Sequence, residues 1–413
     1  MARTPRVAIV GGGIGGLTAA LALHRRGIES IVCEQAPALS EIGAGLNLSP
    51  NAMKAFRALG IEKEAMAIGH QADFQVIRSW RSGHVISRQP RKGLQEQFGG
   101  AYLTVHRADL LDVLARAVPE KFVRLDKRCV AVESGARAAV ARFADGSEVE
   151  ADFVVGADGL HSAVRTSLFG PDAPRFTGCI CYRGMVPLAS LPPGLVTSDG
   201  NMWMGEHGHV VHYVVRRGEL LNIVAHYDSD AWTEESWTRE CDRSELMTTY
   251  ARWHPSLLQL YECTERWYKW ALYDRDPLAA WSKGRATLLG DAAHPMLPYL
   301  GQGACMAIED GVMLAAEIDG RPDDPVAALQ AYEAARLPRT RRAQLGSRAR
   351  ALENHLPSPW ARLKRDIKYR LRQRFAADKT IFQAAWLYSY DVGAEAAQVV
   401  RREPAGSAMP TSA

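Results

Sequence analysis

The sequence lacks the long hydrophobic runs that membrane-spanning proteins contain. None of its uninterrupted apolar stretches approaches the roughly 18 residues of a membrane span. The first residues, MARTPR, are basic, but glycines soon interrupt the apolar run that follows them, so the segment differs from an export signal. We therefore expect a cytoplasmic protein with no integral membrane part.

Paired cysteines and a strong charge of one sign are also missing. The seven cysteines are scattered, and Cys179 and Cys181 have no matching second pair, so we expect reduced thiols and no metal site. A net charge of +4 over 413 residues is too small to favour a nucleic-acid partner, although it permits attraction of anionic ligands. The composition, 47% hydrophobic and 23% charged, is that of a globular protein, and the length predicts two interlocked domains.

A glycine-rich turn opens the chain. Residues 7–16 read VAIVGGGIGG, in which Gly11, Gly13 and Gly16 follow a short apolar run and precede a helix-like segment; the next apolar segment ends in Glu34. Bare backbone at a helix N-terminus suits a phosphate, and a carboxylate about 20 residues on can accept both hydroxyls of a ribose. We therefore predict a dinucleotide site. A tight turn that binds nothing is the less favoured alternative, because strand, turn, helix, strand and acid occur in the expected order.

Two further glycine turns lie at the ends of apolar segments. The sequence GADG at 156–159 follows a strand predicted over 148–155, and the loop 290–303 follows a strand predicted over 285–289 and precedes a long helix. The N-terminus of that helix places a positive dipole end beside the loop, where it can stabilise negative charge on a ligand. We predict that the three turns enclose one elongated ligand.

Four other features complete the expected layout. Residues 122–132 are predicted as one strand, and strands and aromatic residues between about 179 and 273 indicate a separate sheet inserted between the nucleotide-binding elements. A long helix is predicted to end near Gly346. The segment 361–375 predicts a basic amphipathic helix, which is either a surface or subunit-contact helix or, less favoured, a peripheral membrane contact.

The three turns together resemble those of the single-component FAD-dependent aromatic hydroxylases, the class that includes p-hydroxybenzoate hydroxylase. The resemblance spans residues 5 to about 350 and includes LGDAAHPMLPYLGQG at 289–303. It implies a mixed α/β (α+β) fold, in which a Rossmann-like FAD-binding domain of the GR2 type is interleaved with a β-sheet substrate domain and followed by C-terminal helices. The implied boundaries are 1–73, 98–175 and 280–350 for the FAD-binding domain, 74–97 and 176–279 for the substrate domain, 351–400 for the helical region and 401–413 for a disordered tail.

The resemblance also assigns residues to FAD. They are Gly11, Gly13, Ile14, Gly15, Gly16, Glu34, Gln35, Arg107, Asp158, Gly159, Asp291, Gly301, Gly303 and Ala304. Glu34 is implied to hold the adenosine ribose and Asp291 the ribityl chain, while Pro295 is implied to border the reactive face of the flavin. The chain has one complete dinucleotide-binding turn, which fits a family that binds NADH or NADPH transiently.

The substrate side is expected on the inserted sheet. His209 and Tyr213 lie four residues apart on a predicted strand, so their side chains share one face. The resemblance implies that both contact a substrate phenol, where a base favours the more reactive phenolate; simple packing on a half-buried strand is the alternative. Asn47 and Tyr299 are expected to line the same pocket.

Within the class, the motifs are most similar to those of salicylate hydroxylase, 3-hydroxybenzoate 6-hydroxylase and 6-hydroxynicotinate 3-monooxygenase. The implied reaction uses NADH or NADPH and O2 to hydroxylate a small phenolic acid, with salicylate, converted to catechol and CO2, as the first candidate. Pro298 stands where 3-hydroxybenzoate 6-hydroxylases tend to carry Gln, and Asn47 and Tyr299 stand where the hydroxynicotinate enzymes carry His. A hydroxylase of a secondary metabolite and a non-enzymatic flavin-binding regulator are the alternatives, and the protein is expected as a monomer or homodimer.

Overall fold

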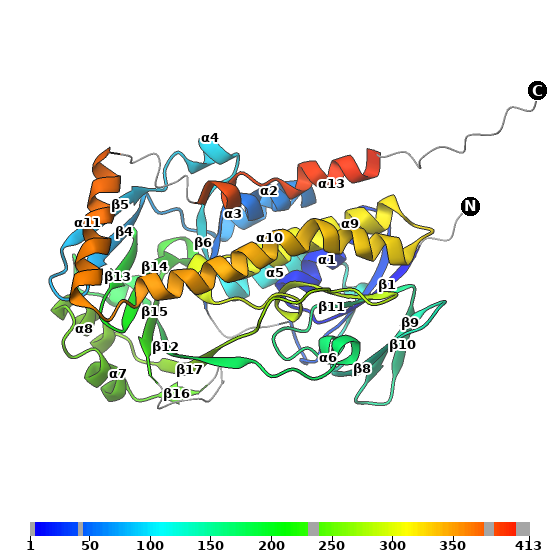
Figure 1. Ribbon diagram of the computed structural model, residues 1–413, viewed down its shortest axis with the longest axis horizontal. Coiled ribbons are helices and arrows are strands. Elements are labelled where there is room, and N and C mark those ends of the chain that lie inside the picture. Colours follow the sequence, from blue (N-terminus) through cyan, green and yellow to red (C-terminus); the bar gives the residue numbers. More distant parts are fainter. Residues whose placement is uncertain (1–4, 40–43, 230–238, 376–383, 402–413) are drawn as a thin grey trace, which may run out of the picture.

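A parallel sheet forms the centre of one half of the molecule. The computed structural model describes residues 5–39, 44–229, 239–375 and 384–401 (Figure 1). Five strands lie in the order β18–β11–β1–β2–β7, and every neighbouring pair is parallel. Their bounds are Arg6–Val10 (β1), Glu29–Cys33 (β2), Val123–Arg124 (β7), Phe153–Gly156 (β11) and Ala286–Leu288 (β18). Residues 7 to 10 are all buried, as a sheet covered on both faces requires.

Helices pack on this sheet and on one another. They are α1 (Ile14–Arg25), α2 (Pro50–Leu59), α3 (Glu62–Ile68), α5 (Arg107–Ala117), α9 (Gly303–Gly320) and α13 (Val392–Arg401). Helix α9 contacts α1, α2 and α13. Gly311 of α9 allows the closest approach, because a Cβ atom there would lie 2.8 Å from the backbone nitrogen of Ala19 in α1.

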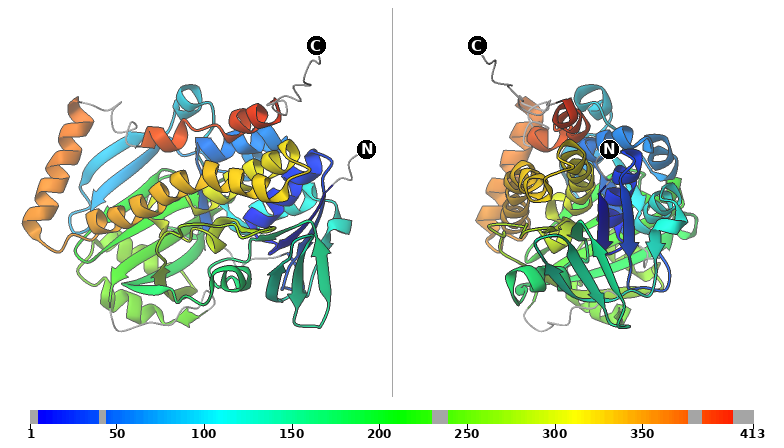
Figure 2. Two further views of the ribbon diagram at one scale, coloured as in Figure 1. Left: turned by 45° about the vertical axis from the view of Figure 1, so that its right-hand side comes forward. Right: turned by 90° about the vertical axis from the view of Figure 1, so that its right-hand side faces the viewer.

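Two segments predicted as single strands are each divided between two sheets. The prediction for 122–132 is wrong: β7 ends at Arg124, the chain turns at Asp126 with a φ of 58°, and β8 (Cys129–Ser134) starts a separate antiparallel sheet. That sheet also contains β9 (Ala139–Phe143) and β10 (Glu148–Ala151). Segment 148–155 divides at Asp152, which accepts a hydrogen bond from the Arg6 amide. The three-stranded sheet lies on the side of the parallel sheet away from α9 (Figure 2).

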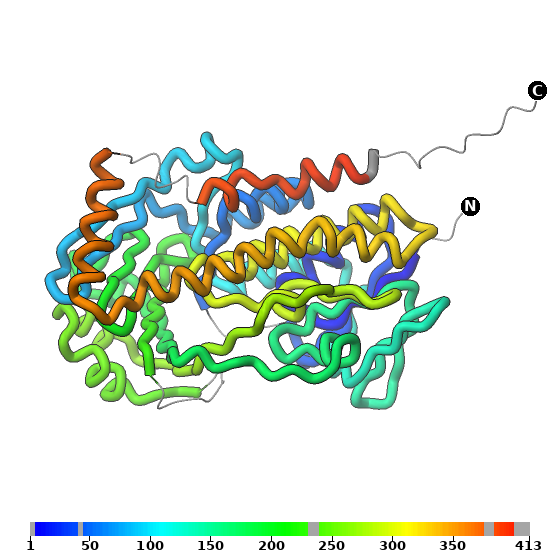
Figure 3. The backbone as a smooth tube through the Cα atoms, in the orientation of Figure 1, coloured from blue at the N-terminus to red at the C-terminus, as the bar shows by residue number. Residues whose placement is uncertain are grey.

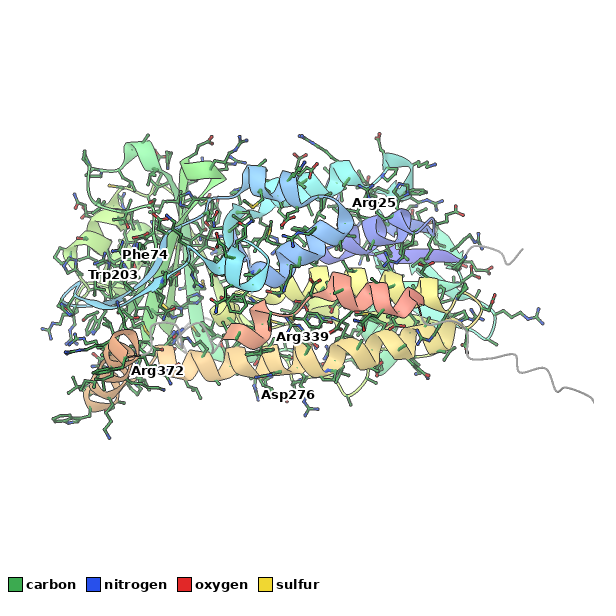
Figure 4. All side chains as sticks on the ribbon, turned by 90° about the horizontal axis from the view of Figure 1, so that it is seen from above. Arg25, Phe74, Trp203, Asp276, Arg339 and Arg372 are labelled. Carbon is green, nitrogen blue, oxygen red and sulfur yellow. The ribbon has the colours of Figure 1, made fainter. Side chains whose placement is uncertain are left out.

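The other half of the molecule contains an eight-stranded sheet. Its order is β16–β17–β12–β15–β14–β13–β4–β5, with one parallel pair, β13 with β4. The bounds are Phe74–Ser79 (β4), Val85–Pro90 (β5), Arg175–Pro187 (β12), Gly200–Met204 (β13), Gly208–Val215 (β14), Leu220–Asp228 (β15), Glu240–Cys241 (β16) and Trp267–Asp274 (β17). Figure 4 shows Phe74 and Trp203 on this sheet and Arg25 toward the opposite end of the molecule. Two segments far apart in the sequence, one with β4 and β5 and the other with β12 to β17, therefore build one sheet.

Shorter elements complete the two halves. Strand β3 (Gly45–Leu48) pairs with β6 (Leu103–His106). Helices α7 (Arg243–Thr249) and α8 (Pro255–Glu262) add to the core of the eight-stranded sheet. Helix α4 (Leu94–Phe98) lies in a segment of the chain that connects β5 with β6.

Helix α10 is longer than predicted. It spans Pro325–Asn354, so the expected end near Gly346 is wrong, and it runs along both halves of the molecule as far as α11 (Figure 1). The side chains of Gln344 and Ser347 donate hydrogen bonds to the carbonyls of Pro295 and Leu297. These buried contacts on both sides of Gly346 stabilise the helix against the low helical propensity of glycine.

The basic amphipathic helix is present as α11 (Pro359–Phe375) and packs against β5 (Figure 3). Tyr369 is buried against Ile77 and Ile86, while Leu363 and Ile367 remain exposed.

The domain boundaries proposed from the sequence stay predictions, and position 351 falls inside α10. The predicted disordered tail from 402 onward lies outside the described residues. Among the helices described, none combines the length and the apolar character needed to cross a membrane.

Candidate functional site

A cleft of about 380 Å³ lies where the parallel strands end. Among its lining residues are Gly11, Gly13, Ile14, Gly15, Glu34, Gln35, Arg107, Asp158, Gly159, Asp291, Gly303 and Ala304. The structure therefore brings together the ends of β1, β2 and β11, the loop after β18 and the start of α9. Two of the residues assigned to FAD, Gly16 and Gly301, are not part of this lining.

The glycines of the first turn have different structural roles. Gly11 has a φ of 107°, and a Cβ there would lie 2.3 Å from the carbonyl oxygen of Ala157. A Cβ on Gly16 would lie 2.0 Å from the carbonyl oxygen of Gly11, so Gly16 is needed for the turn to close. A Cβ on Gly13 would meet no atom within 4 Å. The backbone at Gly13 is thus bare toward the cleft, as close approach of a phosphate requires.

The Glu34 carboxylate is held in place at the end of β2. Its Oε2 accepts a hydrogen bond from the amide of Gly12 (2.6 Å), and its Oε1 accepts one from the amide of Ala36 (2.9 Å). Two backbone donors fix its orientation beside the glycine turn.

The Asp158 carboxylate is turned toward α6 (Ala163–Phe169). Its oxygens accept hydrogen bonds from the Ser162 hydroxyl and from the amides of Ala163 (2.7 Å) and Val164 (3.1 Å). Burial raises the pKa of this carboxyl, and the Ser162 hydrogen bond opposes the shift. Asp158 therefore caps a helix, and main-chain groups of 158 and 159 are available to the cleft.

The Asp291 side chain is exposed and lines the cleft. The cleft walls keep much of the bulk water away from it and so raise the pKa of its carboxyl, while His294 and Arg107 oppose the shift. The sequence analysis missed two basic residues that line the cleft, Lys127 and His161. No spacing rule indicates them, because they reach the cleft only through the turn after β7 and the loop before α6.

A buried charged network supports the loops around the cleft. Glu309 and Asp310 of α9 are fully buried, and both pair with Arg336 of α10 at 2.7 Å. Asp310 also lies 2.6 Å from Nε2 of His294, and Glu309 accepts a hydrogen bond from the side-chain amide nitrogen Nδ2 of Asn51 (2.6 Å). The sequence analysis did not identify this network, although adjacent acids in the apolar segment AIEDG are an unusual feature.

The predicted substrate residues do not all meet in one cavity. A small cavity of about 40 Å³ is lined by Asn47 and Tyr213, together with His70, Ala72, Phe74, Gln75, Arg91, Tyr102, Thr104, Gly200 and Val211. Gly45 packs directly on the flat ring of Tyr213, since a Cβ at Gly45 would lie 2.7 Å from Cε2 of that ring. Asn47 also approaches Gly301, whose Cβ would lie 2.7 Å from the Asn47 amide nitrogen.

Arg91 is the cation of this small cavity. Its guanidinium lies 4.2 Å from the centre of the Tyr102 ring, and Nη1 donates a hydrogen bond to the Tyr388 hydroxyl (3.3 Å). Its Nε is shielded from solvent and has no hydrogen-bond partner among the described residues. A buried donor without a partner is costly, so it marks a position that a ligand can satisfy. The sequence analysis did not identify Arg91.

His209 and Tyr299 belong to a second cluster, and His209 shares one face of β14 with Val211 and Tyr213 of the small cavity. The His209 ring is stacked on His226, with centres 4.4 Å apart, and lies 5.4 Å from the Tyr299 ring. His209 Nδ1 is 2.7 Å from Nε2 of His355. His226 and His355 were not predicted, because β15 and the residue after α10 meet β14 only in the tertiary fold. Pro295 is buried, and its carbonyl accepts a hydrogen bond from Gln344 (2.9 Å).

The comparisons with known proteins support a cleft that binds FAD. The family described as FAD binding domain matches residues 4–345. The chain is 39% identical to a 3-amino-4-hydroxybenzoate 2-monooxygenase of Streptomyces platensis, over 94% of this chain and 96% of that protein. It is 40% identical to a 3-hydroxybenzoate 6-hydroxylase of Aquipseudomonas alcaligenes (83% and 87% covered) and 37% identical to a 6-hydroxynicotinate 3-monooxygenase of Pseudomonas fluorescens (76% and 83% covered).

Solved structures show the same architecture. A salicylate hydroxylase substrate complex superposes with a TM-score of 0.80 at 28% identity, covering 97% of this chain and 99% of that one.

Proposed function

Because this chain belongs to the FAD-dependent aromatic monooxygenases, we propose that it hydroxylates a small aromatic acid that carries a ring hydroxyl group, with NADH or NADPH as the electron donor. One observation carries the proposal: the glycine turn, Glu34, Arg107 and Asp291 line a single cleft at the carboxyl ends of the parallel strands.

The residues of the cleft fit FAD. We expect the backbone of 11–15 to hold the pyrophosphate, Glu34 the ribose and Asp291 the ribityl hydroxyls, while the N-terminus of α9 faces the pyrimidine edge of the flavin. Bare backbone at Gly13, a fixed carboxylate and nearby Arg107 and Lys127 supply the donors, acceptor and positive charge that such a molecule needs. The bound coenzyme supplies the redox chemistry with O2, and the protein binds, orients and excludes water.

The names of the relatives support a common position of attack. The 2-monooxygenase of 3-amino-4-hydroxybenzoate and the 6-hydroxylase of 3-hydroxybenzoate act on a ring carbon next to the carboxyl-bearing carbon. The 3-monooxygenase of 6-hydroxynicotinate acts on the carbon that bears the carboxylate. We propose that this chain also delivers oxygen at, or next to, the carboxyl-bearing carbon. Salicylate, the first candidate from the sequence, belongs to this group.

The small cavity supports an acid as substrate. We propose that Arg91 binds the carboxylate, because its buried Nε lacks a partner and an arginine recognises a carboxylate through parallel N–H donors. Asn47, Tyr102 and Tyr213 line the same space and can contact the ring and its hydroxyl group. About 40 Å³ holds little more than one water molecule, so the cavity must widen when an aromatic acid binds.

We propose His209 as the base that receives the substrate hydroxyl proton. Burial, and then the neighbouring rings of His226 and His355, hold its pKa well below the ordinary value, so His209 is neutral at pH 7 and has a nitrogen lone pair to offer. Tyr299 contacts the His209 ring and connects it to the loop that leads into α9.

The test begins with purified protein. We expect a yellow protein that oxidises NADH or NADPH faster when salicylate, 3-hydroxybenzoate, 3-amino-4-hydroxybenzoate or 6-hydroxynicotinate is added. Mass spectrometry of the product, with a CO2 measurement, separates attack at the carboxyl-bearing carbon, which releases CO2, from attack beside it. Stimulation by a larger phenol and by none of these acids would support the secondary-metabolite alternative instead.

A further inference from the structure

A chain of three side chains leads from the interior of the eight-stranded sheet toward its surface. Nδ1 of His209 lies 2.7 Å from Nε2 of His355, and Nδ1 of His355 lies 2.5 Å from Oδ1 of Asp228. The two rings are buried, while the Asp228 side chain is 37% exposed. His209 is on β14, Asp228 ends β15, and His355 directly follows α10, whose end lies beside these strands (Figure 1).

With Asp228 ionised and His355 neutral, the chemistry of the three groups fixes where the hydrogens lie. An ionised carboxylate can only accept, so the hydrogen between Asp228 and His355 is on Nδ1 of His355. The neutral His355 ring then accepts at Nε2, and the hydrogen of the next bond is on Nδ1 of His209. Nε2 of His209 is consequently left with its lone pair, which is the form a general base needs.

A proton that reaches His209 is not stable there. Three rings lie against His209: those of His226 in β15, of His355, and of Tyr299 in the loop before α9. Two positive charges also act on it, Arg350 of α10 and Arg365 of α11. Burial disfavours the imidazolium most, and the neighbouring imidazoles and the two arginines disfavour it further. Asp228 is the anion at the other end of the hydrogen-bonded chain.

We propose that Asp228, His355 and His209 form a relay that removes the substrate hydroxyl proton from the buried site. This inference rests on the proposed function. Nε2 of His209 takes the proton from the hydroxyl oxygen, Nδ1 of His209 gives its proton to Nε2 of His355, and Nδ1 of His355 gives its proton to Asp228, which exchanges it with water. Return of a proton along the same path, to the product hydroxyl, restores the original tautomers. His355 and Asp228 are positioning residues, because they act through His209.

The same atoms allow a second interpretation. Cys179, Asp228 and His355 each offer a donor atom, and these atoms lie within 4.8 Å of one another, so they could surround a metal ion. Both nitrogens of His355 are, however, already paired with His209 and Asp228. Burial raises the pKa of the Cys179 thiol to about 12, which disfavours the thiolate that a metal requires. These observations favour the relay.

The decisive experiment measures the tautomers and needs no substrate. In FAD-loaded enzyme labelled with 15N-histidine, long-range 15N–1H spectra should show the hydrogen on Nδ1 in both His209 and His355. The Asp228→Asn variant can donate to His355 and should shift the hydrogen of His209 toward Nε2. His226→Phe is the matched control: it keeps a ring against His209, and His226 Nδ1 has no hydrogen-bond partner among the described residues, so the tautomer of His355 should not change.

Activity with a responsive acid provides the second readout. His355→Gln should lower kcat about 100-fold at pH 7 with little change in KM. For an acid whose hydroxyl is not beside the carboxylate, so that its pKa is that of an ordinary phenol, about 10, the deficit should shrink as the pH approaches this value, where solvent removes the proton. Added imidazole should partly restore His355→Ala. A purely structural role predicts neither a pH-dependent deficit nor rescue.

The outcomes separate the two proposals. A hydrogen on Nε2 of His209, or one equivalent of tightly bound metal in the purified enzyme, would overturn the relay even if the enzyme is an active hydroxylase. The predicted tautomers in an enzyme that no aromatic acid stimulates would support the hydrogen-bonded chain and contradict the proposed function.

Discussion

Oδ2 of Asp310 lies 2.6 Å from Nε2 of His294, and both side chains are almost completely buried. The same carboxylate accepts a hydrogen bond from Arg336 Nε (2.7 Å) and from the amide of Gly290 (3.2 Å). One acid of α9 therefore fixes the loop after β18, which carries Asp291, and joins it to α10. The shape of the cleft depends on this buried anion.

Removing Arg336 should strongly destabilise the protein. The Arg336→Met variant leaves Glu309 and Asp310 buried with less positive charge, and breaking a buried ion pair costs about 3–5 kcal/mol. Urea unfolding should show this decrease in the free energy of unfolding. Arg341→Met, on the exposed side of the same helix, is the control and should change it by less than about 0.5 kcal/mol. Equal stability of the two variants would contradict the role of the network.

The same network predicts loss of stability in acid. Burial alone would raise the pKa of Asp310, but the charges of His294 and Arg336 outweigh burial, and this pKa lies below the ordinary 3.8. In the same way, Arg336 and Arg339 lower the pKa of Glu309 below the ordinary 4.5. A lowered pKa in the folded state gives stability that is complete above the unfolded value and is lost as the pH falls through the folded value. The free energy of unfolding should therefore decrease below about pH 4.5. Urea titrations between pH 7 and 3 test this, and Asp310→Asn should show a shallower decrease.

The sequence predicts those parts of the fold whose signals are local. The glycine turn, the strand before it and the acid after β2 are close in the chain, and residues such as Gly11, Gly13 and Glu34 were found from spacing alone. The break at Asp126 and the continuation of α10 beyond Gly346 were not, because pairing partners and buried side-chain contacts from distant segments decide them. Arg91 and His355 show the same limit for the site. Each is a single residue in an unremarkable segment, and only the tertiary fold places it beside Tyr102 or His209.

Two glycines of the same turn should respond differently to alanine. Gly16→Ala places a Cβ 2.0 Å from the Gly11 carbonyl oxygen, so backbone must move and the free energy of unfolding should fall by about 1–3 kcal/mol. Gly13→Ala meets no protein atom within 4 Å and should unfold like the unmodified chain. Its methyl group would, however, occupy space toward the cleft, and we expect FAD affinity to fall about tenfold or more. Calorimetric titration of the apoprotein with FAD, beside urea unfolding, measures both effects. Unchanged affinity of Gly13→Ala would contradict pyrophosphate binding at this turn.

Arg91 should determine recognition of the substrate carboxylate. In Arg91→Gln the cavity loses its cation, and a hydrogen bond between charged groups is worth about 1.5–3 kcal/mol, so KM for the preferred acid should rise about 10- to 100-fold. Lys92→Gln removes an exposed positive charge at the next position and is the matched control for a general loss of attraction to anions. The uncharged amide analogue of the same acid gives a sharper comparison, because it has no carboxylate for Arg91 to bind. If Arg91 holds the carboxylate, Arg91→Gln weakens binding of the acid far more than binding of the amide, and Lys92→Gln changes neither by more than about twofold. A proportional loss of affinity for both compounds in Arg91→Gln would show that Arg91 maintains the shape of the cavity instead.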